Sequence, residues 1–156
     1  MALEQTLILL KPDCVQRGLV GNVTARLEGR GLRLVGLKMM RLDRAKCDEH
    51  YAHLTSRPFY PGLVSFMTSS PIVAMAVSGP EAVKVVRDMC GPTNARNAMP
   101  GTIRGDYSLS TQYNIIHASD SAETALKEVA RFFKKEELFA YERTLDKLTA
   151  AADEKK

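Results

Sequence analysis

The residues of this chain that can do chemistry meet in residues 113–120, Tyr-Asn-Ile-Ile-His-Ala-Ser-Asp. The first half of this stretch is apolar and β-branched, which is typical of a buried strand. The second half is polar, and Asp120 followed three residues later by Glu123 has the pattern of a capping box at a helix start. His117 is therefore expected where a core strand ends and a helix begins, so that its side chain is held rigidly and still faces solvent.

Common catalytic and phosphate-binding motifs are missing from the sequence. It has no Gly-x-x-x-x-Gly-Lys-Ser/Thr or Gly-x-Gly-x-x-Gly loop, no Gly-x-Ser-x-Gly and no His-Glu-x-x-His. Cys47, His50 and His53 share one face of a predicted helix, but the local sequence offers no fourth metal ligand. A partly buried polar face is the favoured interpretation of these three residues.

The elements that must position His117 follow from the apolar pattern. Four segments are predicted to be strands, at residues 6–11, 33–42, 71–77 and 113–116. Helices are predicted at residues 18–29, 43–53, 80–89 and 121–133, with a short one ending at Met67. Residues 91–105 hold three glycines and two prolines without periodicity, which predicts a long functional loop.

This order of elements predicts an α/β sandwich. The favoured fold is ferredoxin-like βαββαβ, a four-stranded antiparallel sheet with helices packed on one face. A doubly wound parallel sheet is the competing topology.

The apolar positions near the C-terminus change phase once. Leu126, Val129 and Phe133 form one helical stripe, and residues 134–137 are all charged. A second stripe follows at Leu138, Tyr141, Leu145 and Leu148. The pattern predicts a break at 134–137 and a second helix after it. We expect one domain at residues 1–142 and a helical C-terminal extension at 143–156, frayed from Ala150 onward.

Composition narrows the class of protein. The 156 residues are 45% hydrophobic and 26% charged, as expected of one globular domain, and no apolar run approaches the roughly 20 residues of a membrane helix. The N-terminus has no signal-peptide pattern, and three scattered cysteines indicate reduced thiols in a cytoplasmic protein. The net charge of +4 favours polyanionic partners, either nucleic acid or nucleotide phosphates.

Six short motifs lie along the chain. They are Lys11-Pro12-Asp13, Gln16-Arg17-Gly18-Leu19-Val20-Gly21, Arg33-Leu34-Val35-Gly36, Arg57-Pro58-Phe59, Pro100-Gly101-Thr102-Ile103-Arg104-Gly105-Asp106 and Asn114-Ile115-Ile116-His117-x-Ser119-Asp120. The last two, in this order and about ten residues apart, form a specific pair. Through these motifs the sequence resembles the nucleoside diphosphate kinases over about residues 5–142.

The resemblance implies a reaction. In this family the γ-phosphoryl group of a nucleoside triphosphate passes to a nucleoside diphosphate by a ping-pong route, with the residue matching His117 as covalent carrier. The chemistry is reasonable, because a neutral imidazole offers a lone pair to phosphorus and two half-reactions let one site serve both nucleotides. The resemblance also implies that Glu128 lies against the histidine ring and that Ser119 hydrogen-bonds nearby. The alternative interpretation of Glu128 is a solvated helix charge, and that of Ser119 is an N-cap hydroxyl, which is compatible with its role near the histidine.

The resemblance further implies a nucleotide site. The matching residues are Lys11, Arg87, Arg104 and Thr93 for phosphate, Asn114 for ribose, Phe59 for the base and Tyr51 as a lining residue. A core aromatic is the alternative interpretation of Phe59, and a solvated helix cation that of Arg87. Mg²⁺ is the implied cofactor. A helix N-cap is the favoured interpretation of Asp120, and a water-mediated neighbour of the metal is the alternative. Because Phe59 offers only a π-face, broad base specificity is expected.

The sequence departs from the family pattern in several places. Cys14 and Ala118 stand where glycine is common, and Lys134-Lys135 replaces His-Pro. From Arg143 on, the chain does not follow the usual C-terminus, which contributes to subunit contacts in many members. The resemblance implies a homo-oligomer, a hexamer or alternatively a tetramer.

The sequence allows two other classes of protein. The basic charge allows a nucleic-acid-binding or regulatory protein on this fold, but lysines and arginines with interleaved aromatics are missing, so nucleic acid is at most a secondary partner. An inactive scaffold is disfavoured, because every matched catalytic position holds the expected residue type. No membrane partner is expected.

Overall fold

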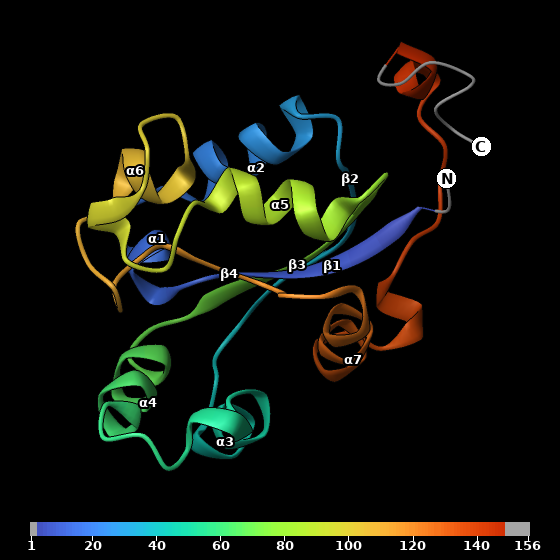
Figure 1. Ribbon diagram of the computed structural model, residues 1–156. Helices are drawn as coiled ribbons and strands as arrows, with labels where there is room; N and C mark the ends of the chain where they lie inside the picture. The colour runs from blue at the N-terminus through green and yellow to red at the C-terminus, as the bar shows by residue number, and fades with distance from the viewer. Residues whose placement is uncertain (1–2, 149–156) are drawn as a thin grey trace.

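A computed structural model describes residues 3–148 of the chain (Figure 1). Its strands are β1 (Glu4–Leu10), β2 (Arg33–Met40), β3 (Ile72–Gly79) and β4 (Ile116–Ala118). They form one antiparallel sheet in the order β2-β3-β1-β4. This order confirms the ferredoxin-like βαββαβ fold and excludes the doubly wound parallel sheet.

The helices are more numerous than the apolar pattern predicts. They are α1 (Pro12–Gln16), α2 (Val20–Gly29), α3 (Arg44–His50), α4 (Tyr60–Thr68), α5 (Ala82–Cys90), α6 (Ile103–Tyr107) and α7 (Ala122–Phe132). Short 3-10 helices lie at Ala52–Leu54, Ala95–Asn97, Lys135–Glu137 and Thr144–Leu148. The segments α1 and α6 are single turns, too short for an apolar stripe to reveal. No helix within residues 3–148 is long and apolar enough to cross a membrane.

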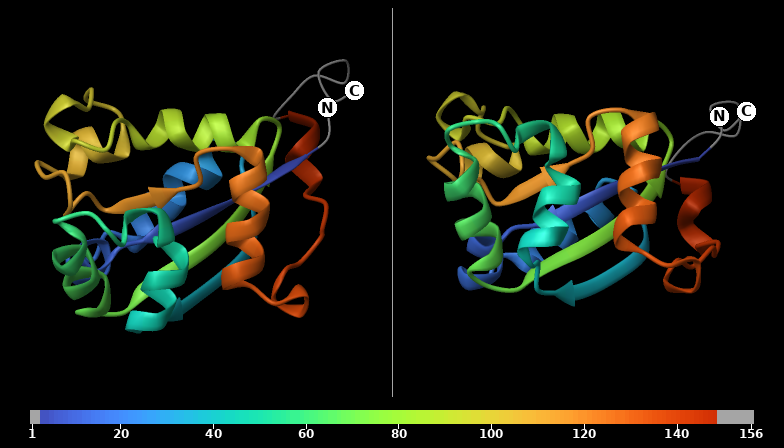
Figure 2. Two further views of the ribbon diagram at one scale, coloured as in Figure 1. Left: turned by 60° about the horizontal axis from the view of Figure 1, so that its bottom comes forward. Right: turned by 90° about the horizontal axis from the view of Figure 1, so that it is seen from below.

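Helices cover both faces of the sheet, so the expectation of a single covered face was wrong (Figure 2). In β1, Leu7 and Leu9 belong to a core shared with α3, α4 and α7. Ile8 and Leu10 belong to a second core, shared with α1, α2, α5 and α6. Successive strand residues point to opposite faces, and an uninterrupted apolar run therefore needs cover on both.

A strained turn precedes β4, so this strand begins at Ile116 and not at Tyr113 as predicted. Ile115 has φ of +74°, and the Ile116 amide donates to the Asn114 carbonyl at 2.8 Å. A β-branched residue in this backbone region persists only where its surroundings hold it. The Lys11 amide donates to the Ile115 carbonyl at 2.8 Å, and the Ile115 amide donates to Asp13 Oδ2 at 3.1 Å. The residues at and just after the end of β1 thus fix the backbone just before His117. His117 itself lies opposite Leu9 in the antiparallel pairing of β4 with β1.

Two predictions about helix ends were wrong. The N-cap of α7 is Ser121, whose Oγ accepts from the Thr124 amide at 3.1 Å, so neither Asp120 nor Ser119 caps this helix. The N-cap of α5 is Glu81, which displaces Pro80 from the helical position expected for it.

The C-terminal segment breaks as predicted but does not form a second regular helix. After α7, the backbone of residues 138–143 is not helical, and the Phe139 amide donates to the Val35 carbonyl on β2 at 2.8 Å. Pairing with a sheet edge satisfies backbone groups that a helix would otherwise have satisfied. The division at residue 143 remains a prediction, and the fraying expected from Ala150 lies outside the described residues.

Candidate active site

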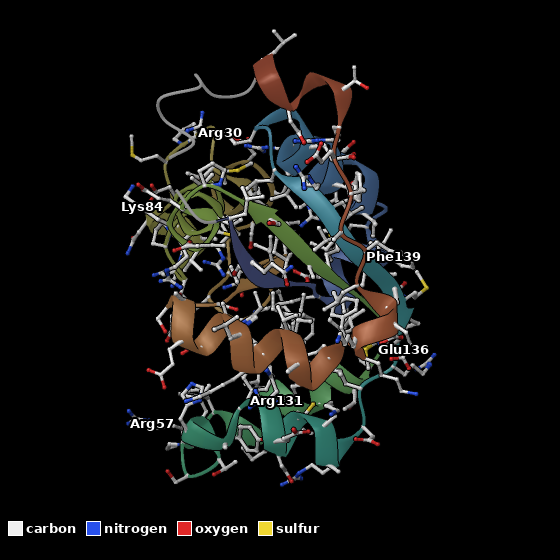
Figure 3. All side chains as sticks on the ribbon, turned by 90° about the vertical axis from the view of Figure 1, so that its right-hand side faces the viewer. Arg30, Arg57, Lys84, Arg131, Glu136 and Phe139 are labelled. Carbon is white, nitrogen blue, oxygen red and sulfur yellow. The ribbon has the colours of Figure 1, made fainter. Side chains whose placement is uncertain are left out.

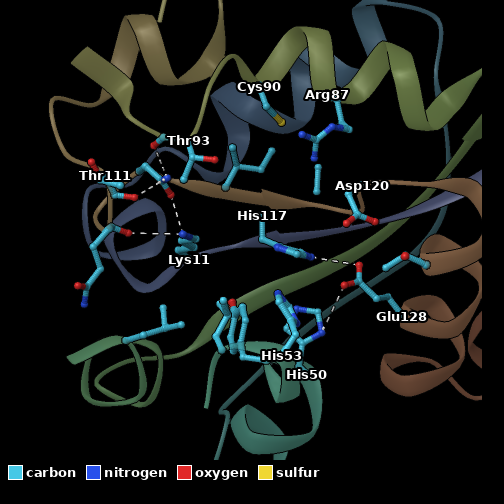
Figure 4. Close-up of a pocket in the computed structure, with 18 of the residues that line it drawn as sticks. Lys11, His50, His53, Arg87, Cys90, Thr93, Thr111, His117, Asp120 and Glu128 are labelled. Carbon is cyan, nitrogen blue, oxygen red and sulfur yellow. Dashed lines mark hydrogen bonds and ion pairs between the residues drawn. The ribbon is translucent and has the colours of Figure 1, made fainter. Parts of the chain in front are cut away.

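A cleft of about 940 Å³ opens beside β4 (Figure 4). Its walls come from the end of β1, from α3 to α5, from the loop after α5 and from α7. Every residue predicted for the site except Ser119 lines it, namely Lys11, Tyr51, Phe59, Arg87, Thr93, Arg104, Asn114, His117, Asp120 and Glu128. The volume suits a ligand of nucleotide size.

His117 forms a buried polar chain with Glu128 and Ser119. Its Nε2 lies 3.1 Å from Glu128 Oε2, and the Ser119 hydroxyl donates to the same carboxylate oxygen at 2.6 Å. Glu128 is buried because α7 packs against β1, which turns the carboxylate back toward the end of β4. The alternative interpretations, a solvated Glu128 and an N-capping Ser119, are therefore wrong.

These contacts fix the ionisation of Glu128 and the tautomer of His117. Burial alone raises the pKa of Glu128, but the hydrogen bond from His117, the positive charge that His117 carries when its ring is protonated, and the bond from Ser119 outweigh it and lower this pKa to about 2. An ionised carboxylate only accepts hydrogen bonds, so the His117 proton lies on Nε2. The lone pair is then on Nδ1, the ring nitrogen that Glu128 does not contact.

Lys11 is a buried cation held by Asn114. Its Nζ donates to Asn114 Oδ1 at 2.6 Å and lies 3.4 Å from the Gln112 carbonyl. Burial, and then the charge of Arg104, lower the pKa of Lys11 to about 8. Because the ammonium is poorly solvated and lies near the positive charge of Arg104, an anion entering the cleft would gain strongly from it.

Asn114 links the loops that form this side of the cleft. Its Nδ2 donates to the carbonyls of Thr93 and Thr111, each at 2.8 Å, while its Oδ1 accepts from Lys11. Both amide protons are thus used within the protein. For a ribose hydroxyl, the role implied by the resemblance, Asn114 has only the second lone pair of Oδ1.

Arg104 is both a cation of the cleft and a brace for its backbone. Nη1 donates to the Gly91 carbonyl at 2.7 Å and Nη2 to the Ile116 carbonyl at 2.6 Å, while Nε lies 3.4 Å from the Asn114 carbonyl. A guanidinium has five N–H groups, so two remain for phosphate oxygens.

The other nucleotide-binding candidates lie at the cleft wall with their polar or aromatic groups available. Arg87 and Thr93 are exposed, and Phe59 is 54% exposed, which excludes the core-aromatic interpretation of Phe59. The Tyr51 hydroxyl is buried and has no hydrogen-bond partner within the described structure. Burial raises the pKa of Tyr51, so its proton stays available to donate.

Two groups of side chains in the cleft offer ligand atoms for a cation. Asp120 presents an exposed carboxylate to the cleft, the kind of hard oxygen ligand that Mg²⁺ prefers. His50, His117 and Glu128 bring ligand atoms within 4.8 Å of one another. However, Arg131 Nη1 lies 3.2 Å from His50 Nδ1, and a guanidinium at this position disfavours a second cation.

His50 and Asp13 were not predicted as part of this site. The spacing of Cys47, His50 and His53 indicated a shared helix face, but it could not show that His50 would be buried beside His117. Asp13 lies within a matched motif, yet its bond to the Ile115 amide depends on a turn that the sequence does not reveal.

Comparison with known proteins gives this geometry its context. The family profile described as "Nucleoside diphosphate kinase" matches residues 4–138. The chain belongs to this family. It is therefore an enzyme, a nucleoside-diphosphate kinase.

Individual nucleoside diphosphate kinases are similar over nearly their whole length. The enzyme of Carboxydothermus hydrogenoformans is 51% identical over 144 residues, which cover 92% of this chain and 97% of that protein. Among solved structures, a Halobacterium salinarum enzyme in complex with CDP has a TM-score of 0.93 at 44% identity, covering 96% and 99% of the two chains. A Borrelia burgdorferi enzyme with bound vanadate and ADP, described as a transition-state mimic, has a TM-score of 0.88 at 37% identity, covering 94% and 96%.

The departures from the family pattern are accommodated without backbone strain. Among the described residues, only Glu81 and Ile115 have positive φ outside glycine, so neither Cys14 nor Ala118 needs a glycine conformation. Lys134 is extended, with φ of −75° and ψ of 159°, a conformation open to any residue.

Proposed function

We propose that His117 is the residue that carries the phosphoryl group between the two nucleotides of this kinase. The observation that supports this role most directly is the 3.1 Å contact of His117 Nε2 with a buried, ionised Glu128. The contact leaves the Nδ1 lone pair on a ring held at the end of a core strand, in a cleft lined by cations.

In the first half-reaction, the Nδ1 lone pair forms a bond to the γ-phosphorus of a nucleoside triphosphate. The bond from this phosphorus to the β–γ bridging oxygen breaks, and the nucleoside diphosphate leaves with the electron pair. The imidazolium that forms is stabilised by the Glu128 carboxylate. A second nucleoside diphosphate then attacks the phosphohistidine in the reverse sense, so that one site serves donor and acceptor.

The cations of the cleft bind and neutralise the phosphates. Lys11, Arg87 and Arg104 surround the same space, and phosphoryl transfer depends on such charge stabilisation more than on covalent chemistry. Mg²⁺ is the proposed cofactor; with Asp120 as an indirect ligand, it would neutralise further phosphate charge. The hydroxyls of Thr93 and Tyr51 are further donors to phosphate.

The nucleoside is proposed to bind through contacts that all nucleotides share. The exposed Phe59 ring stacks on the base, and Oδ1 of Asn114 accepts from the ribose. Neither Phe59 nor Asn114, the two described residues assigned to the nucleoside, is proposed to contact the edge of a base, and this supports broad base specificity.

A homo-oligomer is proposed, with a hexamer favoured over a tetramer. The strand β2 lies at the edge of the sheet, where Leu37 is 53% and Met39 is 62% exposed. Phe139, which lies beside this edge in Figure 3, is 65% exposed. An exposed apolar patch of this kind commonly marks a protein–protein interface.

We also propose a cytoplasmic location. Cys14, Cys47 and Cys90 are all free and buried, as expected in a reducing compartment.

The carrier role is tested with ATP labelled at the γ-phosphate. The wild-type protein should acquire a label that is stable in base and labile in acid, as expected of a phosphohistidine. His117→Gln should fold, because the histidine is partly exposed at a strand end, yet acquire no label. A label retained by this variant would contradict the assignment.

A further inference from the structure

His50, the last residue of α3, is buried beside the His117–Glu128 pair but has no role in the proposed reaction. Its side chain has no exposed surface, and its Nδ1 lies 3.7 Å from Glu128 Oε1. Its ring centroid lies 4.7 Å from that of His117, at an interplanar angle of 78°. His50 therefore contacts both members of the pair, as Figure 4 shows.

His50 is itself held on several sides. The rings of Tyr51 and Phe132 pack edge-on against it, with centroids 4.5 and 5.0 Å away. Arg131 Nη1 lies 3.2 Å from His50 Nδ1, and because a guanidinium can only donate, Nδ1 is the acceptor. Arg131 Nε donates in turn to Glu49 Oε1 at 3.2 Å. Figure 3 shows Arg131 where α7 faces α3, so both helices fix the ring.

The charge of His50 matters for Glu128. Burial, followed by the nearby charge of His117, lowers the pKa of His50 to about 3, so its ring is neutral near pH 7. A cation at 3.7 Å would compete with His117 for the carboxylate. A neutral ring instead excludes water from that side of Glu128 and leaves the negative charge directed at His117.

We propose that His50, oriented by Arg131, is a positioning residue for phosphoryl transfer. It fills the space beside Oε1 and so limits Glu128 to the rotamer in which Oε2 accepts from His117 Nε2. Through Glu128 it keeps the His117 lone pair on Nδ1. This inference rests on the proposed role of His117 as phosphoryl carrier.

Three substitutions separate the role of the His50 ring from that of its acceptor nitrogen, Nδ1. His50→Phe keeps the ring and removes the acceptor, whereas His50→Asn keeps an acceptor near the Nδ1 position and removes the ring. His50→Ala removes both. Arg44→Ala is the control, because Arg44 is an exposed residue of the same helix and does not line the cleft.

The measurement is single-turnover phosphorylation by labelled ATP, which separates nucleotide binding from transfer. Loss of a group that orients a reactive residue typically costs about 10–100-fold. His50→Ala should lower the transfer rate constant by this amount, and His50→Phe and His50→Asn by less. The dissociation constant of ADP should change less than about twofold, because transfer and not nucleotide binding depends on the position of Glu128. Arg44→Ala should match the wild type.

A double-variant cycle with Glu128→Gln separates positioning from general structural support. In the Glu128→Gln background, His50→Phe should lower the transfer rate constant by less than about twofold, because both substitutions remove the same arrangement of Glu128 against His117. An equal loss in both backgrounds, or transfer within twofold of wild type for both His50→Phe and His50→Ala, would overturn the proposal. If His50→Ala fails to fold, His50→Phe decides alone. Failure of the carrier role would appear separately, as label retained on His117→Gln.

Discussion

Raising the pH above 8 should weaken nucleotide binding, because Lys11 then loses its charge in the free enzyme. Burial beside Arg104 lowers the pKa of Lys11 from 10.5 to about 8. Bound phosphate stabilises the ammonium, so only the free enzyme loses the proton in this range. The charged form binds phosphate and predominates below pH 8, and binding is lost as the pH rises through this value.

The size of the effect follows from the population of the charged form. With a pKa of about 8, roughly 90% of free Lys11 is charged at pH 7 and roughly 10% at pH 9. The apparent dissociation constant of ADP should therefore rise about tenfold between these pH values. A lysine with the ordinary pKa of 10.5 would produce almost no change over the same range.

Isothermal titration calorimetry of ADP binding tests this directly. At pH 9, in buffers of different ionisation enthalpy, about 0.9 proton should be taken up per ADP bound, against about 0.1 at pH 7. Lys11→Met should bind ADP weakly and with little dependence on pH from 7 to 9. The reasoning is refuted if the wild-type affinity stays constant from pH 7 to 9 while Lys11→Met binds weakly at both.

Three further predictions concern Glu128, Arg104 and Phe59. Because the pKa of Glu128 is lowered to about 2 in the folded protein, its ionised carboxylate stabilises the fold above the ordinary pKa of 4.5. This contribution is lost as the pH falls from 4.5 to 2. Glu128→Gln should therefore flatten the dependence of the unfolding free energy on pH in that window, as measured by urea denaturation. Arg104→Ala should lower turnover roughly 10²–10⁴-fold. Arg104→Lys should recover only part of the lost turnover, because one ammonium cannot replace the contacts of a guanidinium to several carbonyls. Turnover above about a third of wild type for Arg104→Ala would contradict the role of Arg104 in binding phosphate. Phe59 contacts only the face of the base, which all bases share. The kcat/KM values for ADP, GDP, CDP and UDP as acceptors should therefore lie within about two orders of magnitude, with purines ahead. A preference above about a thousandfold for one base would require a contact to the base edge.

The number and approximate positions of the strands were predictable because the four apolar segments are short and well separated along the chain. Their order was not decided by the sequence, which left a parallel sheet as the competing topology. The two-sided cover of the sheet was also present in the sequence, since the run Thr6–Leu10 is apolar at successive positions rather than alternate ones. The single turns α1 and α6 were not predictable by periodicity. The regular helix expected after residue 137 failed because the sheet edge at Val35 competes for the backbone of Phe139.

The identities of the site residues were predictable from motifs, but their environments were not. Motif position located Lys11, Asn114 and Arg104, yet the bonds that turn these residues into braces for neighbouring loops depend on tertiary structure. The strain at Ile115 likewise exists only because β1 and Asp13 hold that turn. The burial of His50 in the site was not predictable for the same reason, because its helical spacing gives no information about the rings and Glu128 that surround it.

The central claim is that Glu128 holds the proton of His117 on Nε2, so that Nδ1 attacks phosphorus. The most direct test is NMR of the trapped phosphoenzyme, prepared from ATP and ¹⁵N-histidine-labelled protein, which identifies the nitrogen bonded to phosphorus. The account predicts phosphorus on Nδ1 of His117. Phosphorus on Nε2, or on any other residue, would contradict it.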